Sequence, residues 1–276
     1  MPAIAVTKCQ GTGNDFVLLD NRKERPFSYA SMARTLCDRR FGVGGDGLLV
    51  ILPARDAGAD LTMRIFNADG SEAEACGNGT RCIAAFIGRE SGRERALAIE
   101  TPSGVVHTEP AGEPGVVRVD MGVPTLGQPF EIGFAAGGRS YRCARVAMGN
   151  PHAVIFLEDD INAFALDDLA TAVDSLALDS GGVNVEIARV EGQRVHIRVN
   201  ERGVGETWAC GTGACAVAVA AITTGRSTSP IEVVQRGGAV SVRWDGPGKP
   251  AFLTGAAAIV FDTTVDVPDD VGASPR

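Results

Sequence analysis

The sequence predicts an α+β fold made of two pseudo-symmetric domains, each a rolled, mostly antiparallel sheet around one central buried helix. Many short runs of apolar and β-branched residues are separated by turns, and the chain has 35 glycines but few aromatic residues. Two largely apolar segments, Ala75–Ile87 and Ala209–Ile222, open with the same Cys-Gly-x-Gly pattern. A helix that is apolar on all sides belongs in a core, so we expect strands to surround each segment.

The length and composition favour two domains of an ordinary globular protein. The chain has 276 residues, of which 45% are hydrophobic and 22% charged. A net charge of −8, with no basic stripe, argues against nucleic acid and against an anionic membrane surface as partners. Because neither a signal-peptide pattern nor a run of 18 apolar residues is present, we expect a cytoplasmic protein. Seven cysteines there indicate free thiols or a metal site.

In chain order, strands are expected on both sides of a turn at Gly11–Asp15, and a helix over Tyr29–Arg40 with Ser28 as its N-cap. A second ordinary helix is expected at Leu166–Leu176, and a frayed end at Pro268–Arg276. The expected strands are Ile4–Val6, Phe16–Asp20, Leu48–Leu52, Leu61–Phe66, Ala96–Glu100, Val116–Asp120, Arg142–Val146, Ala153–Phe156, Val195–Val199, Val240–Trp244 and Ile259–Phe261.

The two Cys-Gly-x-Gly segments belong to an internal duplication. Residue numbers differ by 134 between Cys76 and Cys210, and the same offset relates Glu72 to Glu206. Thr12-Gly-Asn14 is echoed by Met148-Gly-Asn150 at an offset of 136. Two copies are too few for a solenoid, so we expect two domains related by a pseudo-two-fold axis, with the two helix starts facing each other across a cleft.

A cysteine at a helix start suits acid–base chemistry. A helix N-terminus has unpartnered backbone amides and a partial positive charge, which favour a bound carboxylate and lower the pKa of a thiol. Two such thiols on opposite faces of one carbon could remove a proton from one face and deliver one to the other. The sequence therefore predicts an amino-acid epimerase that uses Cys76 and Cys210.

The other cysteines and motifs are interpreted structurally. Cys9, Cys37, Cys82, Cys143 and Cys215 are expected in the core. A zinc site is a weaker alternative, because the cysteine spacings are wide and no histidine lies beside either pair. Gly42–Gly47 fits a dinucleotide-binding pattern but follows a helix and precedes a strand, so we interpret it as a turn. His107 and His196 are expected on strands facing solvent, whereas His152 could tune a thiol.

The sequence resembles the diaminopimelate epimerase family in seven stretches that span most of the chain and keep the family's order. They are Gly11–Phe16, Asn67–Ser71, Cys76–Cys82, Met148–His152, Gly182–Glu186, Glu201–Thr207 and Cys210–Ala214. The resemblance implies interconversion of LL- and meso-diaminopimelate without a cofactor or metal, in lysine and peptidoglycan biosynthesis. It also implies a homodimer, with no partner besides the small amino-acid substrate.

The resemblance further implies the roles of individual residues. Cys76 and Cys210 are the acid–base pair, and His152 and Glu201 tune the thiols. The substrate-binding residues implied are Asn14, Asn67, Gly77, Asn78, Asn150, Asn184, Glu201, Arg202, Gly211 and Thr212. The first domain would comprise residues 1–119 and 256–276, the second residues 120–255, with the active site in the cleft between them.

The residue types agree with a long dicarboxylic amino acid. Diaminopimelate carries two ammonium and two carboxylate groups, and the asparagines together with Glu201 and Arg202 offer matching donors, acceptors and charges. Three alternatives stay open: an epimerase or racemase of proline, hydroxyproline or histidine on the same scaffold, a phenazine-type isomerase, which normally lacks the cysteine pair, and a non-catalytic thiol redox or metal protein.

Overall fold

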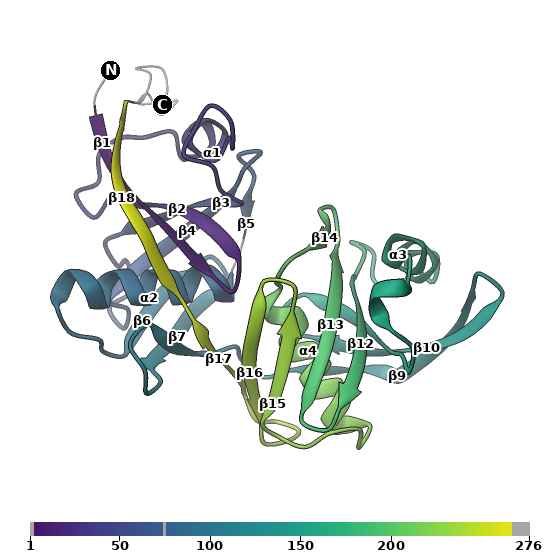
Figure 1. Cartoon of the computed structure of the whole chain (residues 1–276). Helices are drawn as coiled ribbons and strands as arrows, with labels where there is room; N and C mark the ends of the chain where they lie inside the picture. Colours follow the sequence, from purple (N-terminus) through teal and green to yellow (C-terminus); the bar gives the residue numbers. More distant parts are fainter. Residues whose placement is uncertain (1–2, 74–75, 267–276) are drawn as a thin grey trace. The chain divides into compact units, whose positions relative to one another are not determined.

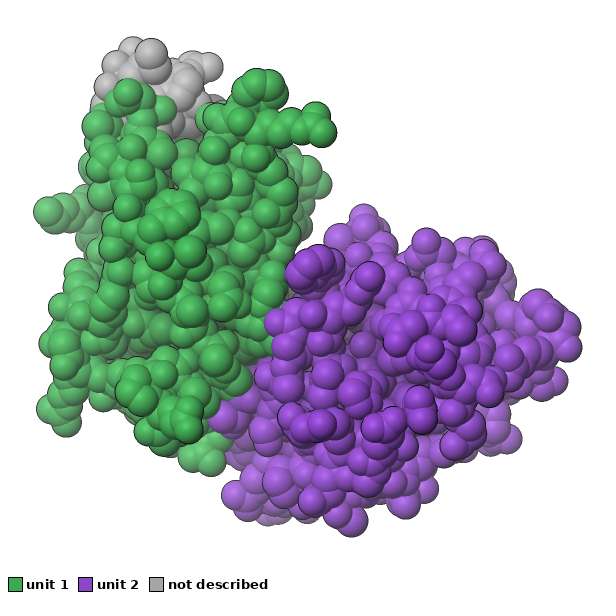
Figure 2. Space-filling view, viewed as in Figure 1, with its two compact units in different colours: residues 1–119, 255–276 green, residues 120–254 purple. Residues whose placement is uncertain are grey.

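The computed structural model describes residues 3–73 and 76–266. The chain divides into two compact units, which Figure 2 colours separately. Unit 1 comprises residues 1–119 and 255–276, and unit 2 comprises residues 120–254. Unit 2 is therefore continuous in sequence, whereas unit 1 contains segments from both halves of the chain.

Unit 1 is a mostly antiparallel sheet with two helices. Its first strand pairs antiparallel with the second and the last, and parallel pairs occur between β2 and β3 and between β4 and β6. The helices are α1 (Tyr29–Leu36) and α2 (Gly77–Ser91). The strands are β1 (Ala3–Gly11), β2 (Asn14–Asp20), β3 (Gly47–Leu52), β4 (Leu61–Asn67), β5 (Glu72–Ala73), β6 (Leu97–Thr101), β7 (Gly104–Pro110), β8 (Val116–Asp120) and β18 (Ala258–Asp266).

Unit 2 has the same kind of sheet. Its parallel pairs join β11 to β12 and β13 to β15, and its other described pairs are antiparallel. The helices are α3 (Leu166–Asp174) and α4 (Gly211–Thr223), with a 3₁₀ turn, η1 (Ile161–Ala163). The strands are β9 (Thr125–Ala136), β10 (Arg139–Ala147), β11 (Pro151–Phe156), β12 (Asn184–Glu191), β13 (Arg194–Glu201), β14 (Gly205–Thr207), β15 (Ile231–Gln235), β16 (Gly238–Trp244) and β17 (Ala251–Ala256).

The duplication predicted from the sequence extends to the order of the elements. The order β1-β2-α1-β3-β4-β5-α2-β6-β7-β8 recurs as β10-β11-α3-β12-β13-β14-α4-β15-β16-β17, and β18 pairs with β1 as β9 pairs with β10. Parallel and antiparallel pairs fall at equivalent places in both units. The predicted α+β fold of two pseudo-symmetric domains is therefore confirmed.

In each unit a central helix lies inside the curved sheet, and a shorter helix covers the other side (Figure 1). The sequence of α4 explains its position, because from Gly211 to Ala221 every residue except Thr212 is buried. Small Ala and Val side chains let strands on several sides, β10 to β13 with β15 and β16, approach this helix. The central helix α2 keeps a polar face as well as a buried one.

Several local expectations need correction. The first helix ends at Leu36 rather than Arg40, because the chain turns at Cys37 and the amides of Val43 and Gly44 bond to the Leu36 carbonyl. Ser28 begins the helix but makes no side-chain capping hydrogen bond. Strands β5, β7, β9, β12, β14, β15 and β17 were not expected. Most of them are very short or contain glycine, proline or charged residues, whereas β12 is buried on both faces over its first five residues. The expectation for Pro268–Arg276 lies outside the described residues.

Two other expectations hold. The Gly42–Gly47 segment forms bends before β3, as interpreted from the sequence. The five cysteines assigned to the core are all buried. Within the described residues, no helix is both long enough and apolar enough to span a membrane.

The close packing of α4 predicts that added volume destabilises it. Ala218 is fully buried, whereas Ala84, its counterpart one duplication offset earlier in α2, is only half-buried. We expect Ala218→Leu to lower the free energy of unfolding by about 1–3 kcal/mol, because a filled core must shift to admit the side chain. Denaturant unfolding of both variants measures this, and an equal or larger loss for Ala84→Leu would contradict it.

Candidate active site

Cys76 and Cys210 occupy the same position in the two units, the N-cap of the central helix. Both have extended backbone conformations, and both sulfur atoms accept a hydrogen bond from a backbone amide three residues later. The distance from Gly79 N to Cys76 Sγ is 3.4 Å, and that from Gly213 N to Cys210 Sγ is also 3.4 Å. The backbone therefore fixes each thiol at a helix start, as the duplicated motif predicts.

The second glycine of each motif is closely packed. A Cβ atom on Gly79 would lie 2.7 Å from Leu49 Cδ2, and one on Gly213 would lie 2.7 Å from Glu186 Oε1. The residues just after each cysteine, Gly77 with Asn78 and Gly211 with Thr212, form the first turn of α2 and of α4. Amides in a first helical turn have no acceptor within the helix, so each helix start suits a carboxylate.

The duplicated asparagines lie beside their cysteines. In unit 1, Asn14 Oδ1 accepts from Asn78 Nδ2 at 3.2 Å and lies 3.8 Å from Cys76 Sγ, while Asn14 Nδ2 donates to Asp46 Oδ2 at 2.7 Å. In unit 2, Asn150 Nδ2 donates to Thr212 Oγ1 at 3.3 Å, and that hydroxyl lies 3.4 Å from Cys210 Sγ. Each asparagine thus contacts the second residue after its cysteine.

We call the residues around each helix-start cysteine a half-site. A fully buried arginine lies in the Cys76 half-site. Arg81 Nη2 donates to Thr12 Oγ1 at 2.7 Å and to Asn78 Oδ1 at 3.0 Å. These bonds orient the Asn78 amide so that its nitrogen points to Asn14. The equivalent position in unit 2 is the neutral Cys215, so the two half-sites differ in charge.

Acidic residues surround Cys210 instead. Burial raises the pKa of the Cys210 thiol well above its usual value, and the carboxylates of Glu201 and Glu186 raise it further. Burial also raises the pKa of Glu201, although hydrogen bonds from Thr207, at 2.5 Å, and from Cys210 lower it in part. The expectation that the helix start lowers the pKa is wrong for Cys210, because desolvation and two carboxylates outweigh the helix.

His152 and Glu186 form a buried pair in this half-site. The distance from His152 Nδ1 to Glu186 Oε1 is 2.7 Å, and neither side chain is exposed. His152 Nε2 lies 3.1 Å from Asn150 Oδ1. Sequence reasoning selected His152 but gave Glu186 no role, although Glu186 ends the Gly182–Glu186 stretch that resembles the family and could have been selected from it.

The remaining predicted residues fall in two places. Asn67 ends β4 and donates to Ser71 Oγ at 2.9 Å. In unit 2, Asn184 Oδ1 accepts the Arg202 amide at 3.0 Å, while Asn184 Nδ2 is buried without a partner among the described residues. Glu201 and Arg202 line a cavity of about 710 Å³, whose other walls are Asp174, Ala177, Asp179–Val183, Asn200 and Gly203–Gly205.

Gln235 is a further residue that sequence reasoning did not select. Its Oε1 atom accepts the backbone amide of Cys210 at 2.7 Å, and its Nε2 atom is buried without a partner in the part of the chain that is described. Gln235 therefore fixes the backbone at which α4 begins.

Within residues 3–73 and 76–266, no group of three or more His, Cys, Asp or Glu side chains is placed to hold a metal ion.

Comparison with known proteins gives sequence matches that all belong to one family. The family model described as diaminopimelate epimerase matches residues 6–127 and 144–260. The diaminopimelate epimerase of Synechococcus sp. (strain JA-2-3B'a(2-13)) is 42% identical over 282 residues, covering 95% of this chain and 98% of the relative. That of Aromatoleum aromaticum is 39% identical over 279 residues, covering 96% and 99%.

Solved structures with the same fold are more distant in sequence. A phenazine biosynthesis protein of the PhzF family from Bacillus anthracis aligns with a TM-score of 0.70 at 18% identity, covering 97% of this chain and all of that chain. A hydroxyproline epimerase from Agrobacterium vitis aligns with a TM-score of 0.67 at 16% identity, covering 96% and 91%. At these identities the likeness establishes the fold alone.

The acidic surroundings of Cys210 predict how its ionisation responds to mutation. In Glu201→Gln a negative charge is removed, so the pKa of Cys210 should fall and its alkylation by iodoacetamide should begin at lower pH. Mass spectrometry of the Cys210 peptide across a pH series measures the midpoint. Glu232→Gln, which changes an exposed carboxylate paired with Arg194, is the control. An unchanged or raised midpoint in Glu201→Gln would contradict the assignment.

Proposed function

The chain belongs to the diaminopimelate epimerase family, and we propose that it interconverts LL- and meso-diaminopimelate with Cys76 and Cys210 as acid and base. The reaction supplies a precursor of lysine and of peptidoglycan. The observation that carries the proposal is the duplicated half-site, in which each thiol caps the start of a central helix. In the proposed working state, the two half-sites face one α-carbon from opposite sides.

The helix starts address the main chemical difficulty, the weak acidity of an α-proton. Each unit of pKa mismatch costs about 1.4 kcal/mol, so the carbanion needs strong stabilisation. The amides of Gly77 with Asn78 and of Gly211 with Thr212 would bind the carboxylate next to the reacting carbon. Fixed dipoles aimed at that carboxylate stabilise the charge that develops on it in the transition state.

The different charges of the half-sites suggest which thiol holds the proton first. Burial and the Glu201 carboxylate keep Cys210 protonated, so Cys210 is assigned as the acid at rest. Cys76, as the thiolate, takes the α-proton from one face while Cys210 delivers its own proton to the other. After one turnover Cys76 carries the proton and Cys210 is the thiolate, which is the starting state for the reverse reaction.

The cavity beside Arg202 fits the distal end of the substrate. Arg202 can bind a carboxylate through two parallel hydrogen bonds, and Glu201, which also lines the cavity, offers an acceptor for the distal ammonium. Asn184, whose Oδ1 atom accepts the Arg202 backbone amide, offers its buried Nδ2 atom as a donor for the carboxylate. A substrate with a single carboxylate would leave this guanidinium without a charged partner. We therefore propose diaminopimelate rather than a smaller amino acid.

We also propose a cytoplasmic location. The seven cysteines all lie in the described residues and form no disulfide, and in the proposed mechanism Cys76 and Cys210 must stay reduced to transfer protons.

The two-base mechanism predicts an asymmetric isotope pattern in deuterated water. The thiol that delivers the proton has exchanged with solvent, whereas the other thiol holds the abstracted proton only briefly. Early product from LL-diaminopimelate should carry deuterium at the inverted carbon, while recovered substrate stays largely unlabelled. Chiral separation with mass spectrometry measures both pools. Equal labelling from the start would exclude two separate bases.

The same assay tests the two thiols individually. Cys76→Ala and Cys210→Ala should each lower the rate of inversion by at least about 100-fold, because each direction needs both groups. Cys215→Ala, a buried cysteine one turn into α4, is the matched control and should keep activity. Near-normal activity of Cys210→Ala would refute the mechanism. Turnover of proline, hydroxyproline or histidine in place of diaminopimelate would refute the substrate.

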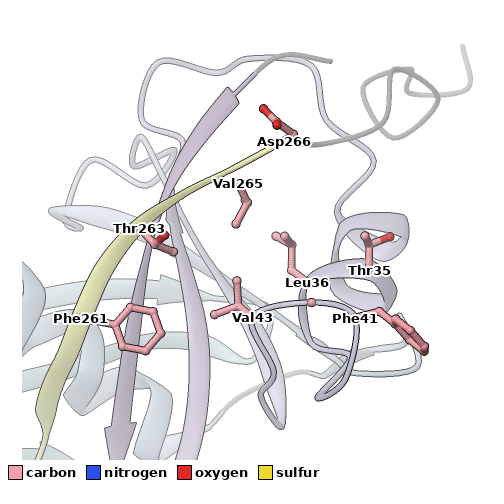
Figure 3. Close-up of a pocket in the computed structure, with 9 residues that line it drawn as sticks. Thr35, Leu36, Phe41, Val43, Phe261, Thr263, Val265 and Asp266 are labelled. Carbon is pink, nitrogen blue, oxygen red and sulfur yellow. The ribbon is translucent and has the colours of Figure 1, made fainter.

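We further propose that the chain forms a homodimer through unit 1. Phe41 is 92% exposed, Val260 is 56% exposed and Phe261 is 46% exposed, which is unusual for large apolar side chains. Phe41 and Phe261 line a cavity of about 510 Å³, and Figure 3 shows its side chains on β18, on the end of α1 and on the segment after it. None of the predicted site residues lines this cavity. A second copy of the chain is the proposed occupant.

Light scattering tests the dimer. The wild-type protein should show twice the chain mass of 28.6 kDa, and Phe41→Ser combined with Phe261→Ser should reduce it to one chain mass. Val123→Ser removes an apolar residue of unit 2 that is 55% exposed, and it should leave the mass unchanged. A monomeric wild-type protein, or a double variant that remains dimeric, would contradict the proposal.

A further inference from the structure

Glu186 is a buried carboxylate whose role the proposed function has not explained. It lies on β12, whose parallel register with β11 places Glu186 opposite Val154, two residues after His152. The side chain is not exposed at all, and its Oε2 atom has no partner among the described residues. Burying an unpaired carboxylate is costly, so the 2.7 Å contact of Oε1 with His152 Nδ1 must offset much of that cost.

A chain of hydrogen bonds leads from this pair to the thiol. His152 Nε2 contacts Asn150 Oδ1 at 3.1 Å, Asn150 Nδ2 contacts Thr212 Oγ1 at 3.3 Å, and Thr212 Oγ1 lies 3.4 Å from Cys210 Sγ. His152 and its contact with Glu186 are buried, whereas the contacts of Asn150 and Thr212 are partly buried. Glu186 is thus connected to Cys210 through three intervening side chains.

The partners fix the direction of the hydrogen bonds. Asn150 donates from its amide nitrogen to Thr212, so its amide oxygen faces His152. A carboxylate oxygen faces the other ring nitrogen. Both neighbours of the ring are therefore acceptors, and only an imidazole with a proton on each nitrogen can donate to both. The Thr212 hydroxyl, which accepts from Asn150, can donate its own proton to Cys210.

We propose that Glu186 is a positioning residue that holds His152 as the imidazolium and thereby directs Thr212 as a donor to Cys210. His152 is then a fixed cation within an ion pair and not a base that removes the proton of Cys210. The Thr212 hydroxyl and the Gly213 amide together supply two donors to Cys210 Sγ. They stabilise the thiolate that remains after Cys210 delivers its proton, so this role of the donors rests on the proposed function.

The number of histidines makes the charge state directly measurable. The chain has only His107, His152 and His196, so a protein labelled with ¹⁵N-histidine gives three ring systems by NMR. Changing His107 and His196 to Gln one at a time assigns the signals. At pH 7.5, taken as about one unit above the usual histidine pKa, both ring nitrogens of His152 should carry protons. A neutral His152 with a single protonated nitrogen would overturn the proposal, even if no Glu186 variant could be purified.

Glu186→Gln tests the link to the thiol. The neutral amide cannot balance the imidazolium, so His152 should lose one ring proton, and kcat should fall by about 10-fold or more while KM changes less than about twofold. Glu191→Gln is the matched control, because Glu191 lies on the same strand and contacts His196, at 3.5 Å, instead of His152. It should change neither the His152 signals nor turnover.

The two readouts separate this proposal from the proposed function. The NMR measurement needs no substrate, so it stands if the substrate or the reaction is wrong. A folded Glu186→Gln protein, with the circular dichroism spectrum of the wild type, that kept both ring protons on His152 or kept full turnover would refute the positioning role. It would leave the two-base mechanism intact.

Discussion

The hydrogen bond from a helical amide to a cysteine sulfur is the interaction on which both half-sites depend. It joins Gly79 to Cys76 and Gly213 to Cys210 at the same distance. A buried helix cannot leave its first amides without acceptors, and these helices use a thiol as a cap, where most proteins use a hydroxyl or a carboxylate. The same cap fixes the sulfur atom that we propose to be reactive, and it leaves the neighbouring amides of the first helical turn able to bind a carboxylate. The backbone amides of the first helical turn therefore serve both the cap and the place where we propose that a carboxylate binds.

The duplication preserved the backbone of the half-sites but not their charge. Unit 1 has the fully buried Arg81 in the helix behind Cys76, whereas unit 2 has Glu201, Glu186 and His152 around Cys210. The two units place equivalent thiols on equivalent backbones, in surroundings of different charge. In the mechanism that we propose, the backbones would supply the equivalent geometry that opposite faces of a carbon need, and the charges would decide which thiol starts with the proton.

The sequence predicted the fold class, both helix-start cysteines and the duplicated asparagines, because short motifs with strict backbone demands leave clear patterns. It missed Glu186, Gln235 and Asp46, which reach the site from a strand or loop distant in sequence. Their partners become visible only when parallel strands are placed in register. It also gave the wrong direction for the pKa of Cys210, since the helix start is a local feature but desolvation and the carboxylates come from the tertiary structure. Strands such as β12 escaped prediction because a strand buried on both faces lacks the alternation that identifies half-exposed strands.

The pairing of β1 with β18 has a consequence for synthesis of the chain. These strands are bonded along nearly their whole length, yet unit 2 is inserted between them in the sequence. While the ribosome makes unit 2, which takes on the order of ten seconds at about 5–20 residues per second, the nascent first unit has an unpaired strand edge. Such edges recruit other strands, including those of neighbouring nascent chains. Unit 2, being continuous, can complete its sheet first, so the half of the enzyme that is translated first is the half that finishes folding last.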